Sequence, residues 1–279
     1  MAHDGLTRRR FIASVAVGAA GLALSRLPSW GQAAEQPLYS FIALADAHLR
    51  EDREGELTGV EKFRRALEAM RGLQPQPESM LMLGDIHPEK LEPLLPEVPM
   101  PIYPVAGNHE TRAHREALRA MFPDVFQGKD FYTVERGDDL FIGMCTARAG
   151  DHVGTFESQD ITPGIGQCEW LIEQLARREQ FARVFMFGHI PPEQQARPSG
   201  MCLEQNDSRW LLDVVAQTHP TALFFGHRHY RVWFDVDGVP VYGLRSCNWN
   251  SKGEPVGFLH VKVFADRLEV EFVDTTPPA

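Results

Sequence analysis

The stretch Ile102-Tyr103-Pro104-Val105-Ala106-Gly107-Asn108-His109-Glu110 guides the interpretation of the whole chain. Its first five residues form a short apolar run that predicts a buried strand, and a polar cluster follows directly. Four other apolar runs also end in a polar cluster, and three of these clusters begin with glycine. The four clusters are Asp46-Ala47-His48, Gly84-Asp85, Gly188-His189 and Gly226-His227-Arg228-His229.

The five clusters share a place in the sequence pattern and a narrow chemistry. Sheets in α/β proteins present reactive side chains at the carboxyl ends of their strands, so we expect the clusters to converge. Each cluster alone also fits an ordinary role, such as a turn, a helix cap or a structural histidine. Five strand-end clusters whose candidate ligands are only Asp, Asn and His favour a shared metal site.

These ligand types suit two transition-metal ions that act on a phosphate ester. Two cations about 3.5–4 Å apart can hold a phosphate between them and supply hydroxide. A carboxylate can bridge the pair, and neutral imidazole and amide ligands complete the shells without repelling an anionic substrate. Nitrogen and oxygen ligands without sulfur suit divalent or trivalent Mn, Fe, Zn or Co, and do not suit Ca or Mg alone.

Composition limits the other possibilities. The 279 residues are 43% hydrophobic and 24% charged, which is typical of a globular protein with a full core. The formal net charge is -10, so duplex nucleic acid is not an expected partner. Four cysteines without CxxC spacing argue against a cysteine-ligated zinc site. A disulfide between Cys168 and Cys202 and buried thiols are both compatible with the sequence.

Residues 1–33 have the three parts of a signal peptide. Arginines at 8–10 precede an uncharged stretch at 11–25, and small residues at 31–33 suit a signal peptidase. The pair Arg8-Arg9, with Phe11-Ile12 one residue later, resembles a twin-arginine (Tat) signal. The alternatives are a generic secretory signal or an uncleaved anchor. The Tat interpretation predicts export to the periplasm by the Tat machinery, and no other segment is expected to enter a membrane.

Residues 34–279 are expected to form one α/β domain. Apolar runs predict strands at 38–44, 79–83, 102–106, 131–135, 140–145, 184–187 and 221–225, and helical spacing predicts helices at 60–70, 111–122, 167–178 and from 206 or 207. Consecutive antiparallel strands follow at about 230–236, 239–244, 257–264 and 268–273. The order favours two mixed sheets that pack face to face with helices outside, a four-layer α-β-β-α sandwich.

The motifs resemble those of the calcineurin-like metallophosphoesterase family. In that family D-x-H, GD, GNH with a following acid, H and GHxH occur in this order, and the chain has all five between Asp46 and His229. The similarity extends over nearly the whole predicted domain, and the final strands are similar to the family's second sheet. One departure concerns purple acid phosphatases, in which a tyrosine ligand takes the position that Pro88 occupies here.

The resemblance implies a role for each matched residue. The implied ligands are Asp46, His48 and His229 for one metal ion and Asn108, His189 and His227 for the other, with Asp85 as the bridge. His109 would contact the phosphoryl oxygen or protonate the leaving alkoxide, and Glu110 would orient His109. A hydroxide that bridges the metals would attack phosphorus in line with the leaving group.

The sequence thus predicts an exported, dinuclear metal-dependent phosphoesterase that acts on small-molecule phosphate esters, with diesters favoured. A phosphomonoesterase and a non-catalytic phosphate-binding protein are the alternatives, and the intact His109 argues against the second. Candidate substrate contacts are Asp151-His152 and Asn248-Trp249-Asn250 in loops, Arg50 and Arg112 near the motifs, and His87 after Asp85. Each of these also fits an ordinary loop position.

Overall fold

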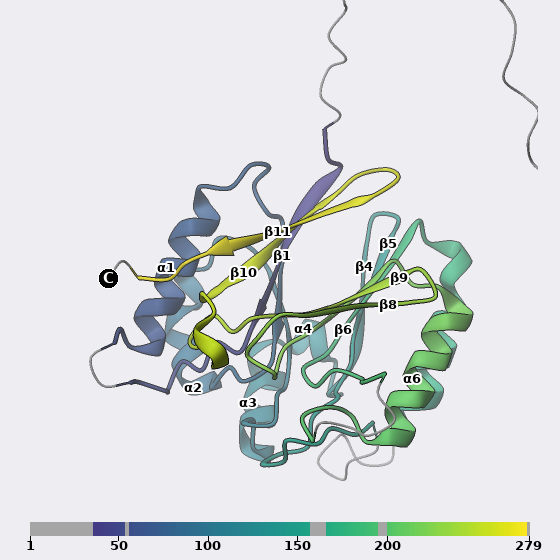
Figure 1. Cartoon of the computed structure of the whole chain (residues 1–279), viewed down its shortest axis with the longest axis horizontal. Helices are drawn as coiled ribbons and strands as arrows, with labels where there is room; N and C mark the ends of the chain where they lie inside the picture. Colours follow the sequence, from purple (N-terminus) through teal and green to yellow (C-terminus); the bar gives the residue numbers. More distant parts are fainter. Residues whose placement is uncertain (1–35, 54–55, 157–165, 195–199, 278–279) are drawn as a thin grey trace, which may run out of the picture. The chain divides into compact units, whose positions relative to one another are not determined.

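The computed structural model describes residues 36–53, 56–156, 166–194 and 200–277. Two β-sheets form the centre of this part of the chain (Figure 1). The five-stranded sheet has the order β11-β10-β1-β2-β3, with β1 (Tyr39–Ala45), β2 (Met80–Leu83), β3 (Ile102–Val105), β10 (Gly257–Val263) and β11 (Leu268–Asp274). The six-stranded sheet has the order β4-β5-β6-β7-β9-β8, with β4 (Tyr132–Arg136), β5 (Asp139–Gly143), β6 (Arg183–Phe187), β7 (Ala222–Phe225), β8 (Val232–Val236) and β9 (Val239–Gly243).

Both sheets are mixed, which confirms the predicted fold class. β1, β2 and β3 are parallel, and β10 and β11 extend that sheet antiparallel to β1. β5, β6, β7 and β9 are parallel, and β4 and β8 are antiparallel edge strands. The sequence pattern suggested that the last four strands form one sheet, but the structure divides them between the two sheets. The β8–β9 hairpin joins the second sheet, whereas the β10–β11 hairpin pairs with β1 in the first.

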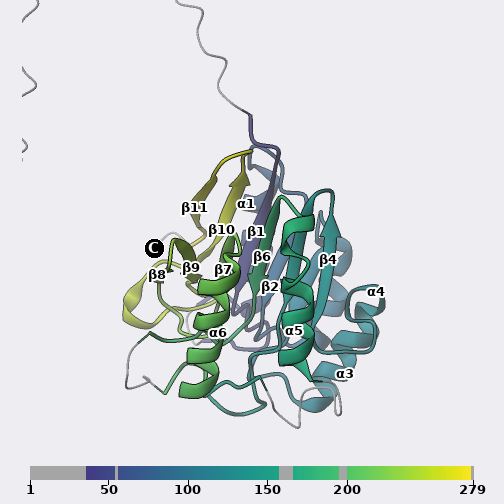
Figure 2. The same ribbon diagram turned by 90° about the vertical axis from the view of Figure 1, so that its right-hand side faces the viewer.

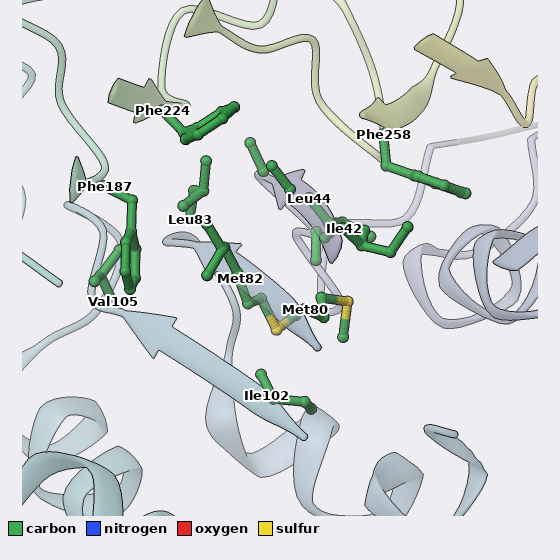
Figure 3. Packing of buried hydrophobic residues seen from close by; sticks show 14 of the residues in the cluster. Ile42, Leu44, Met80, Met82, Leu83, Ile102, Val105, Phe187, Phe224 and Phe258 are labelled. Carbon is green, nitrogen blue, oxygen red and sulfur yellow. The ribbon is translucent and has the colours of Figure 1, made fainter. Parts of the chain in front are cut away.

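Alternating side chains of the six-stranded sheet divide between two apolar clusters. In β6, Phe185 and Phe187 belong to the cluster between the sheets, while Val184 and Met186 belong to the cluster beneath the outer helices. The ring centroid of Phe41 in β1 lies 5.5, 5.2 and 5.7 Å from those of Phe141, Phe185 and Phe224. Figure 3 shows Phe187 and Phe224 together with Val105 and Leu83 of the five-stranded sheet. These contacts join the two sheets.

Helices cover the outer face of each sheet. They are α1 (Gly59–Arg71), α2 (Pro88–Leu91), α3 (Arg112–Met121), α4 (Pro123–Phe126), α5 (Gln167–Leu175) and α6 (Gln205–Thr218), with short 3₁₀ turns η1 (Glu92–Glu97), η2 (Arg178–Gln180) and η3 (Ser251–Gly253). Figure 1 shows α1 outside the five-stranded sheet, and Figure 2 shows α5 and α6 in front of the other sheet. The capping box of α1, between Thr58 and Glu61, is present. Helix α6 begins at Gln205, and its N-cap residue Glu204 makes no side-chain cap. Asp207 lies within the first turn and accepts a hydrogen bond from the Phe156 amide.

The predicted signal peptide at 1–33 lies outside the described residues. Within the described ranges, we find no helix that is both long and apolar enough to span a bilayer. All four cysteines are described, and none forms a disulfide. The pairing of Cys168 with Cys202 that the sequence left open is therefore absent from the structure.

Candidate metal centre

The seven predicted ligands come together at one edge of the two sheets. They follow the carboxyl ends of β1, β2, β3, β6 and β7, as expected for parallel strands in an α/β fold. Each of them is at most 5% exposed. The seven are Asp46, His48, Asp85, Asn108, His189, His227 and His229. The structure therefore brings together residues from five separate loops as the sequence pattern predicted.

The first group of ligands surrounds one side of the Asp85 carboxylate. His48 Nε2 lies 3.0 Å from His229 Nε2 and 3.5 Å from Asp85 Oδ2. His229 Nε2 also lies 3.3 Å from Asp46 Oδ1. Candidate ligand atoms of all four residues lie within 4.8 Å of one another. This group is the first subsite.

The second group lies on the other side of the same carboxylate. His189 Nε2 is 3.3 Å from Asp85 Oδ2 and 3.1 Å from Asn108 Oδ1. His227 completes this second subsite, because candidate ligand atoms of Asp85, His189 and His227 also lie within 4.8 Å of one another. Asp85 Oδ2 thus faces histidines of both subsites, which is the position that a bridging ligand requires.

Each of the four histidines has its outer ring nitrogen beside a hydrogen-bond acceptor. His189 Nδ1 is 2.7 Å from the Leu83 carbonyl oxygen, and His229 Nδ1 is 2.9 Å from that of Trp249. His227 Nε2 is 3.0 Å from the His152 carbonyl oxygen. His48 Nδ1 is 2.8 Å from Glu51 Oε1. A carbonyl oxygen can only accept, so in neutral rings of His189, His227 and His229 the outer nitrogen carries the proton and the tautomer is fixed. The His48–Glu51 contact is at ion-pair distance without hydrogen-bond geometry, and it favours a proton on Nδ1 in the same way.

The inner nitrogens therefore present lone pairs to one another whenever the rings are neutral. Two such lone pairs face each other at 3.0 Å between His48 and His229, and His189 faces the acceptor oxygens of Asp85 and Asn108. Acceptors this close repel unless a proton or a cation lies between them. Neutral imidazole nitrogen with carboxylate and amide oxygen is a ligand set that transition-metal ions accept. The residues present fit a pair of such ions.

The electrostatics of the buried groups agree with this arrangement. Burial alone would lower the pKa of His189, but the carboxylates of Asp85 and Asp46 outweigh it and raise that pKa to about 9. Burial and the charge of His189 lower the pKa of His227 to about 3. Burial would raise the pKa of Asp85, yet His189 and His48 hold it well below its ordinary value. The site keeps its carboxylates ionised and attracts positive charge.

The loops that carry the ligands adopt unusual backbone conformations. Among residues other than glycine, φ is positive at Asp46 (53°), His48 (41°), Asp85 (51°), His227 (71°) and His229 (51°). His227 and His229 therefore do not belong to an extended segment. They lie in a tight bend, and one ring enters each subsite. Left-handed conformations of such residues are costly and are concentrated at functional sites.

The glycines of the motifs are explained by close approach to the ligands. A Cβ atom on Gly107 would lie 2.1 Å from Asp85 Oδ1, and one on Gly226 would lie 2.6 Å from Asp46 Oδ2. Real carbon atoms do not approach so closely. Glycine is therefore required at these positions for the carboxylates to reach the site.

His109 and Glu110 are adjacent in sequence but have very different surroundings. The His109 side chain is 39% exposed, and its Nε2 lies 4.0 Å from Asp85 Oδ2 at the open side of the site. Glu110 is fully buried. Its two carboxylate oxygens accept hydrogen bonds of 2.7–3.1 Å from four backbone amides, those of Asp85, Ile86, His87 and Gly107. Glu110 therefore joins two ligand loops, and any effect on the His109 ring is transmitted through the backbone.

A cavity of about 170 Å³ opens onto the ligands. His109, Met201, Tyr230 and Trp249 contribute to its lining above the metal ligands. Two larger hollows, of about 480 and 530 Å³, lie elsewhere, and neither is lined by any of the seven predicted ligands. Chemistry and not size therefore identifies the smaller cavity as the functional one.

The remaining candidate substrate contacts have different positions. His152 and Trp249 line the cavity, but Arg50 borders the 530 Å³ hollow, and Arg112 is 77% exposed and pairs with Glu116. His87 is buried beside the site, with its ring centroid 6.2 Å from that of His109.

Glu51, which contacts His48, was not identified from the sequence. An acidic residue three positions after a candidate ligand was the only signal, and it is a common pattern in turns.

Three comparisons with known proteins show the family and the fold to which the chain is similar. The sequence profile of calcineurin-like phosphoesterases matches residues 39–231. A Rhodococcus erythropolis protein named "Probable cyclic nucleotide phosphodiesterase" is 24% identical over 227 residues, which cover 74% of this chain and 70% of that protein. A dimetal phosphatase structure from Danio rerio has a TM-score of 0.62 at 17% identity, covering 86% of this chain and 98% of that one. GAP50, described as the anchor in the inner membrane complex of Plasmodium, has a TM-score of 0.57 at 12% identity, covering 86% and 85%. Similarity to these two structures concerns the fold alone.

Proposed function

Because the chain belongs to the calcineurin-like phosphoesterase family, we propose that it hydrolyses small-molecule phosphodiesters with the help of two metal ions. Membership makes the chain a metal-dependent phosphoester hydrolase. The diester preference, the number of ions and export are the proposed parts. The observation that supports the dinuclear site is the convergence of four histidine lone pairs around the Asp85 carboxylate, in two groups that share Asp85 Oδ2.

In this proposal each residue has a definite task. Asp46, His48 and His229 would hold one ion, Asn108, His189 and His227 the other, and Asp85 both. When bound, such a pair supplies Lewis acidity at the phosphoryl group and an activated water at neutral pH. His109 directs Nε2 to the open side and gives a proton to the leaving oxygen. Glu110 keeps the loops of Asp85 and Asn108 in register through the backbone amides.

The charge around the cavity supports a diester over a monoester. A monoester carries up to two negative charges at neutral pH, whereas a diester carries one. Among the described residues that line the cavity, Arg228 is the only Lys or Arg, and its guanidinium already pairs with Glu193 at 3.0 Å. Met201 and Trp249 offer apolar surface to the organic part of an ester.

Turnover of simple esters tests the proposal directly. Protein loaded with Mn²⁺ should hydrolyse bis-p-nitrophenyl phosphate with a kcat/KM at least about 10-fold above that for p-nitrophenyl phosphate. Both esters release the same leaving group at the same metal centre, so the ratio compares a diester with a monoester. Faster hydrolysis of the monoester would favour a phosphomonoesterase. Metal binding without turnover of either ester would favour a non-catalytic phosphate-binding protein.

Export by the Tat route is a second part of the proposal, and it is supported by the sequence of residues 1–33. Replacing Arg8 and Arg9 together by lysine should leave the full-length protein in the cytoplasm of a host with a working Tat system. Cell fractionation followed by immunoblotting measures this. Unchanged export of the lysine variant would point to a generic secretory signal.

A further inference from the structure

Glu51 contacts three residues of the site that come from three other positions in the chain. Its Oε1 lies 2.8 Å from His48 Nδ1 and 3.6 Å from His109 Nδ1. Its Oε2 accepts a hydrogen bond of 3.1 Å from Trp249 Nε1. One carboxylate thus faces a candidate metal ligand, the candidate proton donor and an aromatic side chain that lines the cavity.

Glu51 differs from the other groups that support the histidine ligands. The outer nitrogens of His189, His227 and His229 face backbone carbonyl oxygens, whereas His48 faces a charged side chain. A backbone carbonyl can fix a tautomer, but a carboxylate can also stabilise a positive charge on a ring. A carboxylate has two oxygens and several lone pairs, so it can serve more than one ring.

The His109 ring is oriented between two acidic groups. Nδ1 faces Glu51, and Nε2 faces Asp85 Oδ2 at 4.0 Å. A carboxylate at Nδ1 keeps a proton on that nitrogen, which leaves Nε2 as the atom that exchanges a proton with the substrate. The 3.6 Å separation is longer than a hydrogen bond, and such catalytic contacts commonly shorten when substrate binds.

Trp249 in turn holds the Glu51 side chain in place. Its indole N–H occupies Glu51 Oε2, so that Oε1 is directed to the two histidines. The Arg53 guanidinium lies over the Trp249 ring, 4.2 Å from the centroid, and the His229 ring centroid lies 4.0 Å away. The carboxylate is therefore fixed although its side chain is 34% exposed.

We infer that Glu51 is the positioning residue of His109. Its carboxylate holds the Nδ1–H side of the ring, and Nε2 is thereby aimed at the leaving oxygen. The ring that donates is the imidazolium, with a proton on each nitrogen. As the P–O bond to the leaving group breaks, the Nε2 proton passes to the leaving oxygen, and the ring becomes neutral with its remaining proton on Nδ1, directed at Glu51. Water supplies the hydroxyl that joins phosphorus and the proton that restores Nε2. The inference rests on the proposed function.

A competing role for Glu51 is direct binding of a cation. Candidate ligand atoms of Glu51, His48, His87 and His109 lie within 4.8 Å of one another. The two roles differ in metal content. At saturating metal, a positioning residue can be changed without losing a bound ion, whereas the loss of a ligand removes the ion that it holds.

The kinetic test compares leaving groups in Glu51→Gln. Glutamine has one acceptor oxygen, so it cannot serve Trp249 and the histidines together. With Mn²⁺ loaded, kcat/KM for diphenyl phosphate, whose phenolate needs a proton, should fall about 10- to 100-fold. For bis-p-nitrophenyl phosphate, whose nitrophenolate leaves unprotonated, the loss should stay within about 3-fold. Glu97→Gln is the matched control, because Glu97 is 36% exposed and pairs with Arg64 away from the site.

Equal losses for the two esters, no loss for either, or the loss of a bound ion even at saturating Mn²⁺ in Glu51→Gln would each overturn the positioning role. A second measurement does not depend on turnover. In zinc-loaded protein with ¹⁵N-labelled histidine, the neutral form of His109 should be the Nδ1–H tautomer, and Glu51→Gln should reduce that population. An unchanged tautomer would also contradict the inference. If the wild type hydrolysed neither ester, the proposed function would fail, and the tautomer would still decide the role of Glu51.

Discussion

The space between the two sheets and the edge where the strands end are built from opposite chemistry. Between the sheets, rings such as Phe41, Phe141 and Phe185 pack in ordinary strand conformations and bury apolar surface. At the edge, carboxylates and imidazoles are buried together. Six of the nine positive-φ residues other than glycine in the described chain lie in these loops. The core stabilises the fold, while the edge stores strain and repulsion that bound cations relieve.

The largest predicted effect concerns Asp85, the ligand that both subsites share. Asp85→Ala should lose both ions and reduce ester hydrolysis to the background rate, because both subsites use this carboxylate. Far-UV circular dichroism should stay that of a folded protein, since the core is unchanged. Elemental analysis after dialysis checks the metal content. Glu135→Ala is a suitable control, because Glu135 is an exposed carboxylate that pairs with Arg177 and is not among the residues that line the cavity. If Asp85→Ala kept two ions, metal binding at this edge would not depend on Asp85.

The next largest effect is expected for His109→Ala, which should remove proton transfer at the edge without removing metal binding. His109→Ala should keep both ions and lower kcat for diphenyl phosphate by about 10²- to 10⁴-fold, the usual contribution of a general acid. Steady-state kinetics and elemental analysis measure the two quantities. Near-full activity under saturating metal would mean that His109 has another role.

In the core, Phe41→Ala should lower the free energy of unfolding by about 3–5 kcal/mol, because it removes a ring that contacts three strands of the facing sheet. Chemical denaturation measures the change. Below the unfolding transition the variant should still bind two ions. A loss of metal affinity as large as the loss of stability would show that core and edge are not separable.

Glu110→Gln should have a smaller effect, at the boundary between the two regions. The glutamine NH₂ group would face two backbone N–H donors that now donate to a carboxylate oxygen. The unsatisfied donors should cost about 1–3 kcal/mol of unfolding free energy. Metal affinity should fall as well, since the Asp85 and Gly107 loops lose their connection. Unchanged denaturation and unchanged metal affinity would contradict this account of Glu110.

The sequence predicted the two regions unequally. Continuous apolar runs such as Val184–Phe187 identified the strands of the core, and motif order identified the ligands. The pairing of the last four strands was missed, because a hairpin's sequence does not specify the sheet that it joins. The bend at His227–His229 could not be predicted, because left-handed conformations leave no periodic signal. Glu51 and the backbone contacts of Glu110 depend on loops distant in sequence, so only the fold reveals them.

The most direct test of the central claim is anomalous X-ray diffraction from crystals of the Mn²⁺-loaded protein. The account predicts two anomalous peaks about 3.5–4 Å apart. Both should lie within bonding distance of the Asp85 carboxylate, one with Asp46, His48 and His229 and the other with Asn108, His189 and His227. A single peak, or peaks remote from Asp85, would contradict it.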